Sequence, residues 1–410
     1  MPYNKPWSEA ELAQAKIIVS SHTSMEQACA EMSRTFNRGV GVSNFRDTCS
    51  RRGLGNPRDW LQTPAVVATD PVERKQLEDK QARTVREHKS LTDEVARLRA
   101  IVEYRDTIAH APMKPIVRRE FKSGLREATA VALASDWHVE ERVKPTDTPT
   151  GNAYNLAIAS LRIDRFFQGI VWMVQHHRSA FQIRDMQLWL GGDLVTGHIH
   201  DENVETSAFP PVKAILWLQP QLESGIRFLR DTLELDRLQV VCSYGNHGRD
   251  TKKPRRATGA HHSYEWGMYQ QLAMNFANDD RVEFHAPPSG HQYTDIYDLT
   301  AHYHHGDEIS YGGGVGGITI PINKAVAQWD QARRSDLHNF GHFHQYMNGN
   351  RVANNGSLIG YNAYAMSIKA TPERPQQAFY LVDSKHGKTC CSPLWVGDER
   401  AEAKLWKEAA

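Results

Sequence analysis

The chain has 410 residues, a formal net charge of +1 and five cysteines. This length is sufficient for two or three domains, and the balanced charge gives no overall attraction to nucleic acid or to a membrane surface. The sequence contains no apolar run near the roughly 20 residues of a membrane-spanning helix, no signal-peptide core and no C-x-x-C pair, so we expect a cytoplasmic protein without a membrane partner.

Residues 1–62 have the pattern of a small helical domain. Ser8 to Glu11 is typical of a capped helix start, and Ser24 to Phe36 predicts a second helix. A glycine-containing turn over residues 38–42 then precedes a third helix from Ser43 to Arg52, which we expect Ser43 to cap and Gly53 to end. Helix, turn and helix in this order resemble helix-turn-helix DNA-binding domains as a class.

Basic residues gather on the third predicted helix. Arg46, Arg51 and Arg52 would give it the cationic face that a recognition helix needs in a DNA groove. A small dimerisation or docking domain with a solvated arginine face is the alternative. We therefore predict a DNA-binding arm that contains these three arginines.

A linker and a helical spacer follow. Residues 63–72 contain Pro64 and Pro71 and predict a linker, whereas residues 73–111 are dense in charged residues. Leu91, Val95, Leu98 and Val102 have heptad spacing, which predicts a short coiled coil and a homodimer. A solvated single helix is the alternative.

Residues 125–400 alternate between strand-like and helix-like segments. Short runs of strand length, mostly apolar, lie at residues 130–134, 186–190, 238–242, 301–304 and 337–340, and helical spacing occurs at residues 158–174 and 212–233. This alternation predicts an α/β domain. The run at 301–304 is polar and is the weakest of the five.

A short polar motif follows each of these five runs. Because ligands bind beyond the carboxyl ends of strands in α/β sheets, we expect the motifs to converge on one site. Carboxylate, amide and imidazole donors together suit Mn²⁺, Fe or Zn²⁺ better than Mg²⁺ or Ca²⁺. The motifs supply seven candidate ligands: Asp136, His138, Asp193, Asn246, His305, His342 and His344.

The set of motifs resembles the calcineurin-like metallophosphoesterase superfamily, whose pattern is D-x-H, G-D, G-N-H-D/E, H and G-H-x-H. The resemblance covers about Ala130 to His344. It implies a two-sheet β-sandwich flanked by helices and two divalent metal ions, most simply Mn²⁺. It also implies that Asp136, His138 and His344 hold one metal, that Asn246, His305 and His342 hold the other, and that Asp193 bridges them.

The same resemblance makes His247 the catalytic residue that faces the substrate phosphate, while a metal-bridging hydroxide attacks phosphorus. The family has Asp or Glu after Asn-His, where this chain has Gly248. A carboxylate fixes the tautomer and orientation of a histidine, so another group must do so here, and Asp250 is close in sequence. Trp137 could stack on a base or belong to the core.

The substrate follows less directly from the sequence. A cationic loop after Asn246 suits a polyanion, although a disordered basic loop is the alternative; its basic residues are Arg249, Lys252, Lys253, Arg255 and Arg256. Together with the predicted arm, it favours a DNA nuclease, similar to the double-strand-break repair branch of the family, in a bacterial or phage-infected cytoplasm. A partner ATPase is left open. A phosphatase or phosphodiesterase for phosphoproteins or small nucleotides is the alternative, and a non-enzymatic DNA-binding regulator is a third hypothesis.

Overall fold

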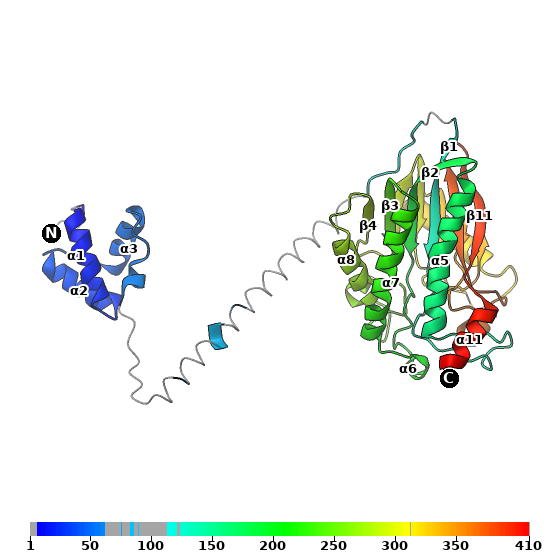
Figure 1. Cartoon of the computed structure of the whole chain (residues 1–410), viewed down its shortest axis with the longest axis horizontal. Helices are drawn as coiled ribbons and strands as arrows, with labels where there is room; N and C mark the ends of the chain where they lie inside the picture. Colours follow the sequence, from blue (N-terminus) through cyan, green and yellow to red (C-terminus); the bar gives the residue numbers. More distant parts are fainter. Residues whose placement is uncertain are drawn as a thin grey trace. The chain divides into compact units, whose positions relative to one another are not determined.

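The computed structural model describes residues 6–61, 75, 83–85, 89, 113–120, 124–311 and 313–409 (Figure 1). The chain divides into two compact units, Met1–Ala96 and Arg97–Ala410. The predicted linker and nearly all of the predicted coiled coil lie outside the described residues. Over the described ranges, no helix combines the length and apolar character needed to cross a bilayer.

The first unit contains α1 (Glu9–Ser20), α2 (Met25–Thr35), α3 (Val42–Arg51) and the short 3₁₀ helix η1 (Pro57–Trp60). Ser8 and Glu11 form a capping box at the start of α1, and the Ser24 side chain caps α2. The prediction that Ser43 caps the third helix was wrong, because α3 begins one residue earlier with Gly41 at its N-cap and Ser43 lies inside its first turn. Phe45 and Cys49 of α3 are buried against α1 and α2.

The second unit contains a six-stranded mixed sheet in the order β11-β10-β1-β2-β3-β4. Strands β1 (Arg126–Ala134), β2 (Phe181–Leu190), β3 (Arg237–Cys242) and β4 (Val282–His285) are parallel, so their carboxyl ends share one edge. Strand β10 (Gln376–Asp383) pairs antiparallel with β1, and β11 (Gly387–Trp395) pairs antiparallel with β10.

A second sheet of five strands has the order β5-β6-β7-β9-β8. Its strands β6 (Leu299–Tyr303), β7 (Leu337–Phe340) and β9 (Val352–Asn354) are parallel. Strands β5 (Gln292–Ile296) and β8 (Met347–Asn348) close its two edges in antiparallel pairing. The two sheets with their helices confirm the prediction of a mixed α/β fold.

Alternating side chains of β1 explain why the two sheets pack face to face. Ala130 and Ala132 lie in the core beneath the helices, whereas Val131 and Leu133 lie in a second core with Ala301 and Leu337 of the other sheet, because successive strand residues point to opposite faces. The small alanines on one face and the larger residues on the other bury both faces of the strand.

Helices cover the outer faces of both sheets. The helices α5 (Leu156–His177), α7 (Pro211–Thr232) and α8 (Tyr264–Asn275) contribute to the core against the six-stranded sheet, and α9 (Thr319–Ala332) packs on the other sheet near Phe340. Figure 1 shows α5 and α7 running alongside the strands. Shorter elements complete the unit: α6 (Asp201–Thr206), η2 (Gly259–His262), α10 (Ala363–Ser367) and α11 (Glu399–Ala409).

Structured residues extend on both sides of the predicted 125–400 span. Ile116 is fully buried and pairs with Ile296, which adds a short bridge beside β5. Arg119 forms ion pairs with Glu127, Asp185 and Asp236 at the opposite end of the sheet from the polar motifs. Beyond residue 400, Glu402 of α11 forms an ion pair with the buried Arg162 guanidinium of α5.

Candidate metal centre

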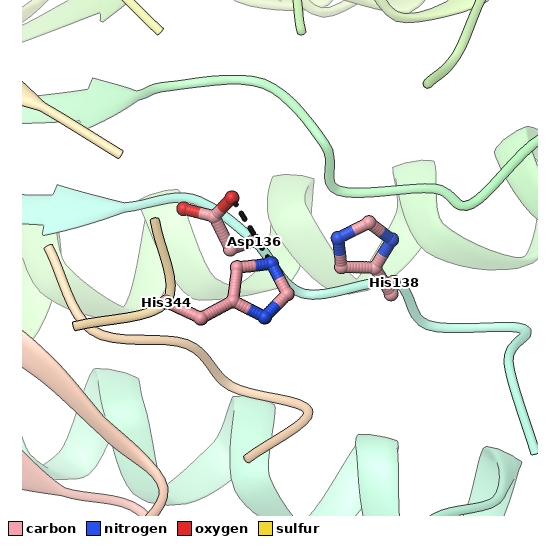
Figure 2. A group of neighbouring side chains, drawn as sticks. All are labelled: Asp136, His138 and His344. Atoms are coloured by element: carbon pink, nitrogen blue, oxygen red, sulfur yellow. Dashed lines mark ion pairs between the residues drawn. The ribbon is translucent and has the colours of Figure 1, made fainter. Parts of the chain in front are cut away.

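Asp136, His138 and His344 form the first group of candidate ligands. One ligand atom from each lies within 4.8 Å of the others, and all three side chains are buried. Asp136 and His138 follow β1, whereas His344 follows β7 of the other sheet, and the His344 Nε2 atom lies 3.5 Å from Asp136 Oδ1 (Figure 2). This is the same trio that the resemblance assigned to the first metal.

A second group consists of Asp193, His305 and His342, whose ligand atoms also lie within 4.8 Å of one another. The His305 Nε2 atom lies 2.9 Å from Asp193 Oδ2, and the other oxygen of Asp193 accepts the backbone N–H of His247 at 2.8 Å. Asp193 therefore sits between β6 and the loop that contains Asn246. His304, the neighbour of His305, belongs to a different cluster.

Three candidate ligands present a buried atom that lacks a hydrogen-bond partner among the described residues: His138 Nε2, His344 Nδ1 and Asn246 Oδ1. A buried polar atom without a partner costs about 1–3 kcal/mol. Lone pairs on imidazole nitrogens and on an amide oxygen are the donors that a divalent cation accepts. The residues present therefore fit a pair of divalent cations.

The backbone at these ligands is in an uncommon conformation. Asp136, His138, Asp193, His342 and His344 all have left-handed φ angles, between 47° and 72°. A non-glycine residue in this region is rare, and several together at one place are typical of functional sites, where the surroundings hold them. This backbone conformation occurs in tight turns and directs the side chains of these five residues back toward the strand ends.

Glycines allow these turns to approach one another. A Cβ atom at Gly245 would lie 2.1 Å from Asp193 Oδ1, and one at Gly192, whose φ is +83°, would lie 2.2 Å from the Gly245 nitrogen. No side chain fits at either position. The close contact of the loops after β2 and β3 is what brings Asp193 beside Asn246.

Neighbouring charges keep the carboxylates of Asp136 and Asp193 ionised. Burial opposes ionisation of Asp193, but His305 and His247 hold the pKa of Asp193 well below its usual value. Burial lowers the pKa of His342 to about 3, whereas Asp193 overcomes the effect of burial on His305 and raises its pKa to about 10. A cation bound at His305 must therefore displace a proton, because metals bind neutral imidazole.

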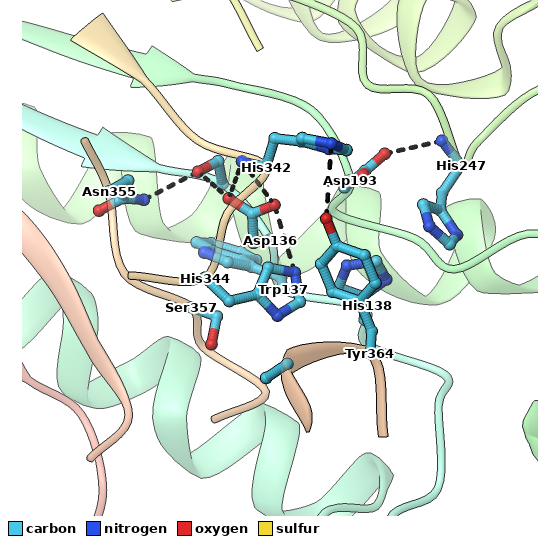
Figure 3. Close-up of polar contacts among 12 residues, drawn as sticks. Asp136, Trp137, His138, Asp193, His247, His342, His344, Asn355, Ser357 and Tyr364 are labelled. Carbon is cyan, nitrogen blue, oxygen red and sulfur yellow. Dashed lines mark hydrogen bonds and ion pairs between the residues drawn. The ribbon is translucent and has the colours of Figure 1, made fainter. Parts of the chain in front are cut away.

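A hydrogen-bonded chain holds Asp136 in place. The Asn355 Nδ2 atom donates to Ser135 Oγ at 3.0 Å, and Ser135 Oγ donates to Asp136 Oδ2 at 2.5 Å (Figure 3). The backbone N–H of His342 lies 3.0 Å from both Asp136 oxygens. Outer partners of this kind orient metal ligands.

His247 is oriented by a backbone carbonyl. Its Nδ1 atom lies 3.0 Å from the backbone carbonyl oxygen of Thr196, which can only accept a hydrogen bond. In the neutral ring Nδ1 therefore carries the proton, and Nε2 has a lone pair. Burial lowers the pKa of His247, against the opposing effect of Asp193. The suggestion that Asp250 orients His247 was wrong, because Asp250 instead contacts His262 Nδ1 at 2.8 Å.

Glu265 of α8 occupies the space beside Gly248. A Cβ atom at Gly248 would lie 2.9 Å from Glu265 Cγ, so residue 248 has no room for a side chain. The buried Glu265 carboxylate accepts N–H groups from Leu194 at 2.6 Å, Val195 at 3.3 Å and Gly245 at 2.9 Å. It ties the Asp193 loop to the Asn246 loop, a role that no local sequence signal predicted.

Of two aromatic residues in this region, Tyr364 lies beside the candidate ligands and Trp137 lies in the core. Tyr364 of α10 lies beside the candidate ligands, with its hydroxyl 3.5 Å from His342 Nε2 and its ring centroid 5.0 Å from that of His344 (Figure 3). Sequence analysis missed it because it lies beyond every motif. Trp137 is fully buried and donates to Gln377 Oε1 at 2.9 Å, so it is a core residue and cannot stack on a base.

The predicted basic loop divides into two sets. The Arg249 guanidinium donates to the carbonyls of Asn246, Thr251 and Lys252, so this arginine shapes the loop. Arg256 pairs with Glu308 at 2.7 Å. The remaining cations, Lys252, Lys253 and Arg255, are exposed.

The three arginines predicted for the arm also differ. Arg46 and Arg51 are exposed on α3, where Arg51 Nε donates to the Asp47 carbonyl at 3.2 Å. Arg52 is used within the unit, because its Nη2 atom donates to the Trp7 carbonyl at 3.2 Å. Among the described residues, the guanidinium groups of Arg46 and Arg51 make polar contacts only with Asp47 of their own helix, at 4.0 Å and 3.2 Å, so they are the better candidates for binding a partner.

Comparison with known proteins gives weak structural similarities. No family model and no curated protein matches the chain. A hypothetical protein from Pyrococcus horikoshii is similar at 13% identity and a TM-score of 0.32, covering 68% of this chain and 94% of its own. A predicted phosphoesterase from Streptococcus pneumoniae is similar at 12% identity and a TM-score of 0.25, with 62% and 84% covered.

Vacuolar protein sorting 29 from Cryptosporidium parvum is similar at 13% identity and a TM-score of 0.26, covering 65% of this chain and 97% of its own.

Proposed function

We propose that this chain is a two-metal-dependent phosphodiester hydrolase that acts on DNA. The observation that carries the proposal is the pair of ligand groups, Asp136–His138–His344 and Asp193–His305–His342, together with the unpartnered buried oxygen of Asn246. Two divalent cations, with Mn²⁺ the first choice, would supply charge neutralisation at phosphorus and an activated water. Asp193, between the groups, is the candidate bridging ligand.

His247 would face the phosphate from the rim of this centre. Its ring centroid lies 5.0 Å from that of His138, and its backbone N–H is fixed on Asp193. Because Nδ1 donates to Thr196, only the charged ring can release a proton from the other nitrogen to a leaving oxygen. His247 would therefore act as an acid when it is charged and as a hydrogen-bond acceptor when it is neutral.

Two features support DNA as the substrate. Exposed Lys252, Lys253 and Arg255 lie in the loop that begins just after Asn246, where a polyanion would extend from the centre. The first unit presents Arg46 and Arg51 on one short helix. Cations at both places suit a substrate with many phosphates better than a single phosphate group.

Cleavage of labelled linear and closed circular DNA, single- and double-stranded, tests this proposal with Mn²⁺, with chelator and with Asp193→Asn. We expect chelator-sensitive cleavage that Asp193→Asn reduces by at least about 100-fold, because the variant removes the charge shared by both ligand groups. Cleavage of circles would identify an endonuclease.

Intact DNA combined with hydrolysis of a phosphomonoester or phosphodiester dye by the same preparation would overturn the DNA assignment. It would favour a phosphatase or phosphodiesterase for phosphoproteins or small nucleotides, with the first unit as a docking arm. Absence of any chelator-sensitive hydrolysis would overturn the enzymatic proposal itself.

A further inference from the structure

A second collection of metal-binding side chains lies beside the candidate centre. His291, His304 and Glu308 each offer one ligand atom, and these atoms lie within 4.8 Å of one another. They line a cavity of about 210 Å³ whose wall also includes Asn246. None of the three belongs to the two ligand groups described above.

His291 is the end of a row of hydrogen-bonded imidazoles. Its Nδ1 atom lies 2.9 Å from His302 Nε2, and His302 Nδ1 lies 3.1 Å from His338 Nδ1. At the far end His338 Nε2 lies 3.3 Å from Asp330 Oδ1, and at the near end His291 Nε2 lies 3.5 Å from Glu308 Oε2. Three neutral imidazoles have three N–H protons for these four contacts, so one contact has none.

The far end of the row determines which contact lacks a proton. Arg351 Nη2 has two N–H groups, and both are used by Asp330 Oδ2 at 2.7 Å and the Ser335 carbonyl at 2.6 Å. Arg351 Nη2 also lies 3.4 Å from His338 Nε2, but the two shorter contacts use both of its N–H groups, so His338 Nε2 carries its own proton and donates to Asp330. Each ring then accepts from the next, and His291 Nε2 is left as a bare lone pair that faces the Glu308 carboxylate.

Two acceptors that face each other require a positive charge between them. His302 and His338 are fully buried, where an additional positive charge would be costly, so the interior of the row is not the place for it. The charge must come from the cavity end, from either a proton on His291 or a metal ion.

Nearby carboxylates are arranged for a metal ion at this end. Arg256 contacts Glu308 Oε1 and Asp307 Oδ2, which leaves Glu308 Oε2 toward His291 and Asp307 Oδ1 4.0 Å from His304 Nε2. The 3.5 Å separation of His291 Nε2 from Glu308 Oε2 is close to the roughly 3.4 Å between two ligands of a tetrahedral Zn²⁺ ion. The His304 Nδ1 atom accepts the backbone N–H of Gly306, so the proton of the neutral ring is on Nε2. Binding of a metal through Nε2 therefore requires the proton to move to Nδ1 and this hydrogen bond to break.

We propose that His291, His304 and Glu308, with Asp307 beside them, form a third divalent-cation site that prefers Zn²⁺. Its nitrogen and carboxylate ligands match the donor set of Zn²⁺, and the row behind His291 fixes the tautomer, as outer-shell partners of metal-bound histidines do. The site is independent of the proposed hydrolysis, because it shares no ligand with the two other groups.

Metal counting tests the site without any activity measurement. The full chain is stripped with chelator, reloaded with Zn²⁺, desalted and analysed by elemental mass spectrometry. We expect three Zn²⁺ ions per chain for the wild type and one fewer for His291→Ala and for Glu308→Gln. His386→Ala is the matched control, because His386 is exposed on the turn between β10 and β11, and it should keep the wild-type count.

Asp193→Asn separates the two proposals. It should lower the count at the first two groups, and adding His291→Ala to it should remove one further ion. A wild-type count no higher than that of both His291→Ala and Glu308→Gln would overturn the third site and leave a proton on His291 as the charge. Circular dichroism verifies that each variant is folded.

Discussion

Single residues at the centre are constrained by space as much as by chemistry. Gly245 to Ala would place a methyl group on the Asp193 carboxylate, since the ideal Cβ position is 2.1 Å from Oδ1. We expect a loss of about 2–3 kcal/mol in unfolding free energy and a lower metal content. Gly267→Ala is the control, because its Cβ meets no atom within 4 Å inside α8, and it should stabilise the helix by about 0.5–1 kcal/mol. Equal effects of the two changes would contradict this account.

His247 supports a second prediction at this scale. His247→Gln keeps the backbone N–H on Asp193 but removes the imidazole, so hydrolysis should fall by roughly 10²–10⁴-fold. The metal content should stay unchanged because His247 belongs to neither ligand group. Steady-state kinetics with parallel metal analysis checks both expectations, and a variant that loses metal along with activity would make His247 a ligand.

The side chains that gather in the two groups could be predicted from the sequence because they lie within four residues of the end of a strand-length run, and short motifs at strand ends are local signals. The roles of Thr196 and Glu265 could not, because a backbone carbonyl has no sequence signature and Glu265 reaches the site only through the packing of α8. The polar character of the run at 301–304 has a physical reason in His302, which faces His338 across the β6–β7 pair.

At the scale of elements, α8 connects two loops that belong to different strands. Glu265→Gln would place one oxygen and one amide nitrogen where two oxygens now accept three backbone N–H groups, so at least one of these N–H groups loses its acceptor. We expect a loss of about 2 kcal/mol in stability and weaker binding of metal at Asp193 and Asn246. Thermal unfolding with and without Mn²⁺ measures both, and a midpoint equal to that of the wild type in both conditions would remove Glu265 from this role.

The starts of helices also depend on more than the local sequence. The Ser8 cap of α1 is a local side-chain pattern and was predicted, but Ser43 was expected to cap α3 and does not, because the chain turns into the helix at Gly41. The basic residues of the loop after Asn246 were predicted to bind a polyanion. Arg249 and Arg256 instead have partners that only the folded loop brings near.

At the scale of the whole molecule, the chain joins a helical unit, whose helix α3 presents the exposed Arg46 and Arg51, to a unit that contains the candidate centre. Arg46→Ala with Arg51→Ala should weaken DNA binding and reduce its salt dependence by about one unit of slope per lost phosphate contact. Hydrolysis of a small phosphodiester dye should be unchanged. Binding titrations over a range of salt, with the exposed Arg374→Ala as control, check this, and an unaltered salt slope would favour a protein partner for the arm.

Each group of candidate ligands takes side chains from both sheets. Asp136 and Asp193 follow β1 and β2 of the six-stranded sheet, whereas His344, His342 and His305 follow β7 and β6 of the other. A bound cation would therefore hold the two sheets of the sandwich together at this edge. Resistance of this unit to heat and to proteases would then depend on the metal supply of the cell, and metal starvation would lower the amount of folded protein as well as the proposed hydrolysis.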